Sequence, residues 1–203
     1  FHLYCLNCLH GTPYMPEFTN NWIYQHLDPD AVRLRAYQFH SEGGGCMHAV
    51  SRSIIQSVAE KMPDPKPEFP YQAMVYGFGG FVGQGTLCGA VNGAVAAISL
   101  FTGQDRALLH RVSSDVLMWC RTTELPQFVP PGGSADDIPR NVCDSLQCTD
   151  MVMFWQRVAK GISPKPSLGE RCRRLSADLA GRTAEALNEH LCGADHDSAD
   201  KTS

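Results

Sequence analysis

Small residues that recur every four positions in the middle of the chain constrain the fold more than any other feature. Gly89, Gly93 and Ala97 follow a glycine-rich segment, residues 77–85, which interrupts any helix until about Thr86. Positions four apart lie on one face of a helix, so a neighbouring helix can approach this face closely. We therefore expect a helix capped by Thr86 that forms the centre of a tight bundle.

Helical signals on both sides of this segment define the fold class. Thr149 can cap one helix, and Ser167 with Glu170 forms a capping box at the start of another. No strand-like alternation is sustained. The expected helices are a short one after Asp28 and four others over about 46–61, 106–120, 150–160 and 167–190. The prediction is an all-α fold, a compact helical bundle, with an irregular N-terminal arm at 1–40, a cysteine-rich redox domain at 41–192 and a polar tail at 193–203.

Charge and hydropathy exclude several classes of function. A formal net charge of −4 does not indicate the basic surface that nucleic-acid binding requires, and the sequence contains no recognisable hydrolase site. The longest apolar run, 94–101, is far shorter than the roughly 20 residues of a membrane span. The chain begins at Phe1, and we expect an exported, periplasmic protein whose signal segment is absent from this sequence.

The nine cysteines point to metal chemistry. An odd number cannot all pair within one chain, and their spacing is not that of a disulfide scaffold. Four of them lie near an expected helix N-terminus, where free N–H groups and the helix dipole favour a thiolate and suit an anionic metal centre. These candidate ligands are Cys46, Cys88, Cys148 and Cys172, with Cys143 as an alternative. Spacing alone does not choose iron–sulfur over zinc, and we assign Cys120 and Cys192 to packing and the tail.

A second possible site lies in the arm, in the segment C-L-N-C-L-H. Cys5 and Cys8 have the CxxC spacing of a haem c site, but Leu9 stands where histidine must follow, and His10 comes one residue late. A zinc or second-cluster half-site, a dithiol pair or a structural turn are together favoured over covalent haem. His40 and His48 flank Cys46, and we interpret them as surface or interface residues, with an axial haem ligand or a proton-coupled neighbour of a metal ligand as the alternatives.

Three stretches resemble a known family. They are GGGCMHAV, GFGGFVGQGTLCGAVNGAVAAISL, and Cys148 with the downstream GERCRRLSADLAGRTAEALN. Together they are similar to the C_GCAxxG_C_C family of redox proteins, most closely its split-Soret cytochrome c branch. The resemblance implies a helical domain, export by the twin-arginine route and an iron–sulfur cluster held by scattered cysteines. It matches the same four cysteines named above. Members of the branch are dimers with c-type haems bound through CxxCH motifs, which this chain lacks.

The predicted function is electron transfer, by a carrier or redox subunit rather than a stand-alone enzyme, with a [2Fe–2S] or similar cluster. One alternative is a thiol–disulfide oxidoreductase that uses Cys5 and Cys8. Another is a c-type cytochrome or a structural subunit of a larger redox complex, docked through the aromatic arm. Expected partners are redox proteins and a second copy of the chain, because the small-residue face and the long arm suggest a homodimer.

Overall fold

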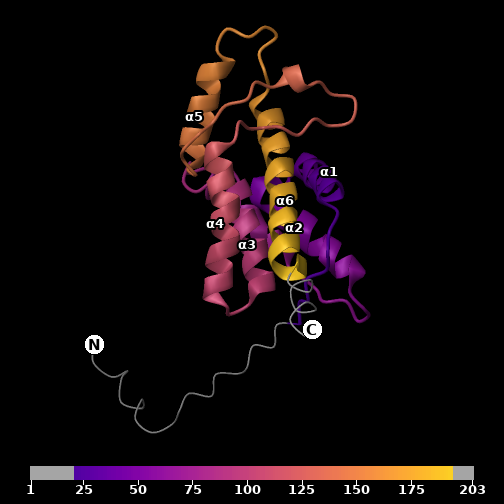
Figure 1. Ribbon diagram of the computed structural model, residues 1–203. Helices are drawn as coiled ribbons and strands as arrows, with labels where there is room; N and C mark the ends of the chain where they lie inside the picture. Colours follow the sequence, from indigo (N-terminus) through magenta and orange to yellow (C-terminus); the bar gives the residue numbers. More distant parts are fainter. Residues whose placement is uncertain (1–20, 194–203) are drawn as a thin grey trace, which may run out of the picture.

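The computed structural model describes residues 21–193, and over this range the chain is helical (Figure 1). The described residues contain no β-strand, only isolated bridges from Leu87 to Gln147 and from Leu125 to Asn141. The all-α prediction is therefore confirmed. The α-helices are α1 (Pro29–Phe39), α2 (Gly45–Lys61), α3 (Gly89–Thr102), α4 (Arg106–Thr122), α5 (Cys148–Ala159) and α6 (Leu168–Cys192). Shorter turns are a π-helical segment (His40–Gly44) and 3-10 helices at Tyr71–Gly77 and Ala135–Asp137.

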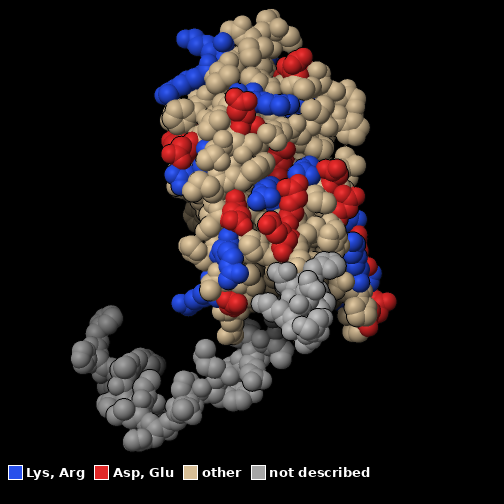
Figure 2. Space-filling model, viewed as in Figure 1, with Lys and Arg blue, Asp and Glu red and all other residues tan. Residues whose placement is uncertain are grey.

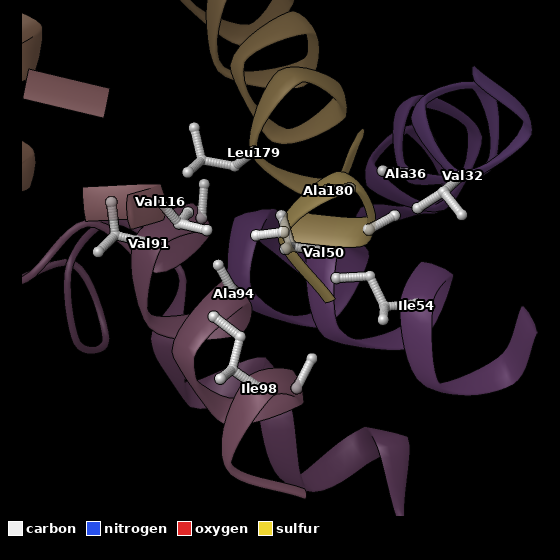
Figure 3. Close-up of a cluster of buried hydrophobic side chains, with 14 of the residues drawn as sticks. Val32, Ala36, Val50, Ile54, Val91, Ala94, Ile98, Val116, Leu179 and Ala180 are labelled. Atoms are coloured by element: carbon white, nitrogen blue, oxygen red, sulfur yellow. The ribbon is translucent and has the colours of Figure 1, made fainter. Parts of the chain in front are cut away.

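Helix α6 runs through the bundle and packs against α1, α2, α3 and α4 (Figure 1). Its buried face carries Leu179 and Ala180, which point toward apolar side chains of the surrounding helices (Figure 3). Most of these side chains are aliphatic and have at most 1% of their surface exposed. The labelled members from the other helices are Val32, Ala36, Val50, Ile54, Val91, Ala94, Ile98 and Val116. Burial of this cluster is the main force that holds the bundle together.

The described part of the predicted arm packs against the bundle. The Tyr24 hydroxyl donates a hydrogen bond of 2.8 Å to Asn188 on α6, and Val32 and Ala36 of α1 belong to the core. Asp28 caps α1, because its carboxylate accepts a hydrogen bond from the Asp30 N–H. The boundary predicted at residue 40 falls at the end of α1, and a kink at Gly43, whose φ is 94°, separates α1 from α2. Residues 1–20 lie outside the described range.

The small-residue face of α3 allows the close helix approach that its spacing predicts. A Cβ atom on Gly93 would lie 2.5 Å from the backbone oxygen of Met47 on α2, and one on Gly89 would overlap the Gly77 carbonyl. Neither position has room for a side chain. Helix α3 therefore lies directly against α2.

Two predicted caps are wrong. Helix α3 begins at Gly89 with Cys88 as its N-cap, and the Thr86 hydroxyl instead donates to the Gly80 carbonyl. Helix α5 begins at Cys148, one residue before Thr149, whose hydroxyl donates to the Gly85 carbonyl. Both hydroxyls bond to the glycine-rich loop, so tertiary contacts displace the local capping role. The cap at Ser167 is confirmed, because its hydroxyl accepts from the Glu170 N–H.

Figure 2 shows interspersed acidic and basic side chains on one face of the molecule. This face has no large region of a single sign among the described residues. Ion pairs among the described residues include Arg33 with Asp30 and Arg173 with Glu170. None of the described helices combines the length and apolar character that crossing a membrane requires.

Candidate metal centre

Two loops place Cys88 and Cys148 beside each other. The Cys88 N–H donates to the Leu146 carbonyl at 2.8 Å, and the Cys148 N–H donates to the Thr86 carbonyl at 2.6 Å. These bonds join the end of the glycine-rich loop to the segment that precedes α5. The N-terminus of α3 and that of α5 are thereby held next to each other.

Missing side chains in the glycine-rich segment leave room for the cysteines. A Cβ atom on Gly80 would lie 2.7 Å from the Cβ of Cys148, and one on Gly89 would lie 3.2 Å from the Cβ of Cys46. Gly80 also has a φ of 69°, in the left-handed region that favours glycine. The run GFGGFVGQG therefore serves close packing of backbone against cysteines, in agreement with its lack of a phosphate-binding lysine.

The four predicted ligands converge, and we call Cys46, Cys88, Cys148 and Cys172 the four-cysteine site. A hydrogen bond donated to Cys172, together with burial, raises the pKa of Cys46 well above its ordinary value. Burial raises the pKa of Cys88, and the neighbouring Cys172 raises it further. Burial also raises the pKa of Cys148, to about 11, with further contributions from Cys88 and Cys172. Each thiol therefore lies within electrostatic range of at least two others.

Arg171 places a buried positive charge at this site. The residue is 2% exposed, and its guanidinium donates at 3.4 Å to the Met151 carbonyl while Nε has no hydrogen-bond partner. No ion pair of residues 21–193 includes Arg171. Hydrogen bonds from Cys46 and from Arg171, and the Arg171 charge, lower the pKa of Cys172. A buried guanidinium without a carboxylate calls for another anion nearby.

Further hydrogen-bond donors face individual sulfurs. The N–H groups of Ala90 and Val91, at the start of α3, point to Cys88, and both stabilise its thiolate. The Ser176 hydroxyl does the same for Cys46, whose Sγ also lies 3.4 Å from Nε2 of His40. Donors of this kind stabilise metal-bound thiolates and tune the metal's potential.

The remaining candidates occupy other positions. Cys143 is buried and donates to the Ser145 carbonyl at 3.7 Å, and it perturbs Cys120 rather than the four-cysteine site. Burial, followed by the neighbouring Cys88, raises the pKa of Cys120 to about 12, as expected for a packed thiol. The second predicted site, Cys5, Cys8 and His10, lies outside the described residues.

The interpretation of the two flanking histidines as surface residues needs correction. His48 is only 4% exposed, both of its ring nitrogens lack hydrogen-bond partners, and its ring packs against Gly44. His40 is partly buried and contacts the Cys46 thiol. Gly44, in the glycine-rich turn between the two histidines, packs against the ring of His48 and helps to bury it. This contact is not apparent from the sequence pattern.

The donors around the four-cysteine site are thiols, N–H groups and one guanidinium. Across residues 21–193, no group of three or more His, Cys, Asp or Glu side chains is arranged to hold a metal ion. Four converging thiols, a buried unpaired guanidinium and several N–H donors fit an anionic iron–sulfur centre.

Comparisons with known proteins relate the chain to redox proteins. Residues 48–186 match a family described as "Putative redox-active protein (C_GCAxxG_C_C)", a range that begins two residues after Cys46. The chain is 34% identical over 174 residues to split-Soret cytochrome c of Desulfovibrio desulfuricans, covering 84% of this chain and 62% of that protein. The chain thus spans less than two thirds of the length of this relative.

The fold also matches a solved structure described as "A novel iron centre in the split-Soret cytochrome c" from the same species. The TM-score is 0.74 at 31% sequence identity, and the match covers 87% of this chain and 73% of that one. The resemblance predicted from the sequence is confirmed in both sequence and structure.

Proposed function

Because the chain belongs to the C_GCAxxG_C_C family of redox-active proteins, we propose that it transfers electrons through an iron–sulfur cluster held by the four-cysteine site. The observation that carries the proposal is the buried Arg171 beside these thiols. Removal of a full charge from water is costly unless an opposite charge meets it. A cluster ligated by four thiolates supplies that opposite charge.

The thiol pKa values divide the four-cysteine site. The hydrogen bond to Cys172 and burial raise the pKa of Cys46, and burial with neighbouring thiols raises the pKa of Cys88 and Cys148, so without metal these three groups retain their protons. Cys172, whose pKa is lowered to about 6, is the one thiol of the site that favours the thiolate near pH 7. Iron binding removes the retained protons, because a thiol that coordinates a metal ion is deprotonated. The N–H donors and the Arg171 guanidinium are already oriented toward the sulfurs, so little reorganisation accompanies cluster binding. Donation and acceptance of single electrons is the chemistry that such a cluster supplies.

A pair of cysteine substitutions tests the site. Cys88 and Cys120 are buried to a similar degree, with 4% and 1% of their surface exposed, and only Cys88 belongs to the four-cysteine site. We expect Cys88→Ser to abolish retention of iron and acid-labile sulfide after anaerobic purification, while Cys120→Ser retains both. Equal loss from the two variants would refute the assignment, since it would show a general effect of disturbing a buried thiol.

A second candidate function, a c-type cytochrome, follows from the relative's name. The segment Cys5–His10 has the required CxxC, with Leu9 in place of the histidine that must follow. We propose that this segment carries no covalent haem. Intact-mass spectrometry of the denatured protein tests the point, because thioether-bound haem survives unfolding whereas a cluster is lost. A mass increment of one haem on the peptide that contains Cys5 and Cys8 would favour the cytochrome instead.

The setting that we propose is an exported redox protein that exchanges electrons with other redox proteins, as a carrier or as a subunit of a larger assembly. A homodimer is the assembly that we favour, with the N-terminal arm reaching the second copy. Light scattering of the full chain and of a chain without residues 1–20 measures this directly, and the shorter chain keeps α1, which belongs to the core. A monomer at micromolar concentration in both cases would contradict the dimer.

A further inference from the structure

The turn between α1 and α2 brings a histidine onto one sulfur of the four-cysteine site. His40 opens the turn His40–Gly44, and its Nε2 lies 3.4 Å from Sγ of Cys46, six residues later. Gly43 and Gly45 have φ values of 94° and 76°, which kink the backbone between α1 and α2 at positions where glycine is the unstrained residue.

The surroundings of His40 determine which of its atoms meets the sulfur. Burial, followed by the positive charge of Arg173, lowers the pKa of His40, and Glu170 partly opposes this effect. These two residues on α6 are the charged groups that act on the ring. A histidine ring carries a proton on one nitrogen when neutral and on both when charged, so Nε2 can hold an N–H in either state. A metal-bound thiolate only accepts hydrogen bonds, so the proton belongs on Nε2, the nitrogen that faces Cys46.

We infer that His40 is a positioning residue for the redox centre: its Nε2–H donates a hydrogen bond to the Cys46 thiolate and raises the reduction potential of the cluster. The inference rests on the proposed function, since the effect needs a cluster bound at the four-cysteine site. Reduction adds negative charge to the sulfurs, so a donated hydrogen bond stabilises the reduced form more than the oxidised form. The same N–H also fixes the orientation of the Cys46 side chain.

Three histidine variants separate this role from a general structural effect. His40→Leu removes the donor, and His40→Gln keeps an amide N–H that can reach the sulfur. His110→Gln changes an exposed histidine on α4 and serves as the matched control. The measurements are the iron and sulfide content, the visible spectrum and the reduction potential of each cluster-loaded full-length protein at one fixed pH.

We expect the potential of His40→Leu to shift to more negative values and the potentials of His40→Gln and His110→Gln to stay near that of the unmodified protein. An unchanged potential in His40→Leu with the cluster retained would overturn the inference and leave the proposed function intact. Loss of the cluster from both His40 variants would also overturn the inference, because His40 would then act as a cluster ligand or as a residue that supports the fold. An unmodified protein that holds no iron and no sulfide would instead refute the proposed function, and the inference with it.

Discussion

Replacing Arg171 with glutamine tests the charge balance of the four-cysteine site. Arg171 is 2% exposed, its guanidinium bonds to the Cys172 thiol, and no ion pair of the described residues includes it. Without iron, the raised pKa values of Cys46, Cys88 and Cys148 keep these groups as neutral thiols. Without iron, Arg171 meets only the thiolate of Cys172, whose pKa is lowered to about 6, whereas with the cluster bound it meets the larger negative charge of the whole centre.

The size of the effect follows from Coulomb's law. Two unit charges about 4 Å apart in a medium of effective dielectric constant about 20 attract each other by about 4 kcal/mol. We expect Arg171→Gln to lower the free energy of unfolding of the cluster-loaded protein by about 4 kcal/mol more than that of the iron-free protein. Because each 1.4 kcal/mol is a factor of ten, cluster affinity should fall roughly a thousandfold.

Anaerobic urea unfolding of both forms, followed by far-UV circular dichroism, measures the difference. Arg174→Gln is the matched control, because Arg174 is also buried but pairs with Glu170 and Asp137, independently of any cluster. This variant should destabilise the two forms equally. An Arg171→Gln protein that loses the same free energy with and without the cluster would refute the argument from charge.

Two further predictions concern packing and pH. Gly93→Ala should lower the free energy of unfolding by about 1–3 kcal/mol, since the added Cβ meets a Met47 backbone oxygen at 2.5 Å. Gly169→Ala, in the first turn of α6 with its nearest contact at 3.7 Å, should raise the free energy of unfolding by about 0.5–1 kcal/mol. Urea unfolding in which both variants change the free energy in the same direction would contradict this prediction. Burial raises the pKa of Asp178 from 3.8 to about 6, although the N–H groups of Gln127 and Phe128 oppose the shift. The folded state thus holds a proton that the unfolded chain has released, so the contribution of Asp178 to the free energy of unfolding is fully present below about pH 4 and falls by about 3 kcal/mol up to about pH 6. Asp178→Asn should abolish this slope in a pH series of unfolding curves, and an identical slope in the variant would exclude Asp178 as its origin.

The helices could be predicted because their signals are local. Periodicity indicates α2, α4 and α6 to within about two residues, and the Ser167 cap lies next to the helix that it serves. The roles of Thr86 and Thr149 could not be predicted in this way. Their hydroxyls bond to glycine-loop carbonyls several residues or more away along the chain, and these contacts exist only once the loop has packed.

The cysteines of the site could be proposed from the sequence because helix N-termini favour thiolates wherever the helices lie. The site also needs Arg171 and His40, whose roles depend on tertiary burial. A signal for Arg171 was present, since it precedes Leu175 and Leu179 by four and eight residues and so occupies a core position of α6. A charge at such a position indicates a buried anionic partner. No comparable pattern marks His40, which reaches Cys46 through the kinked turn between α1 and α2.

Iron and acid-labile sulfide analysis of the anaerobically purified full-length protein, with zinc determined on the same sample, tests the central claim most directly. Four thiolates beside a buried guanidinium predict iron and sulfide in equal amounts, both lost in Cys88→Ser. Stoichiometric zinc with no sulfide would contradict an iron–sulfur centre at the four-cysteine site.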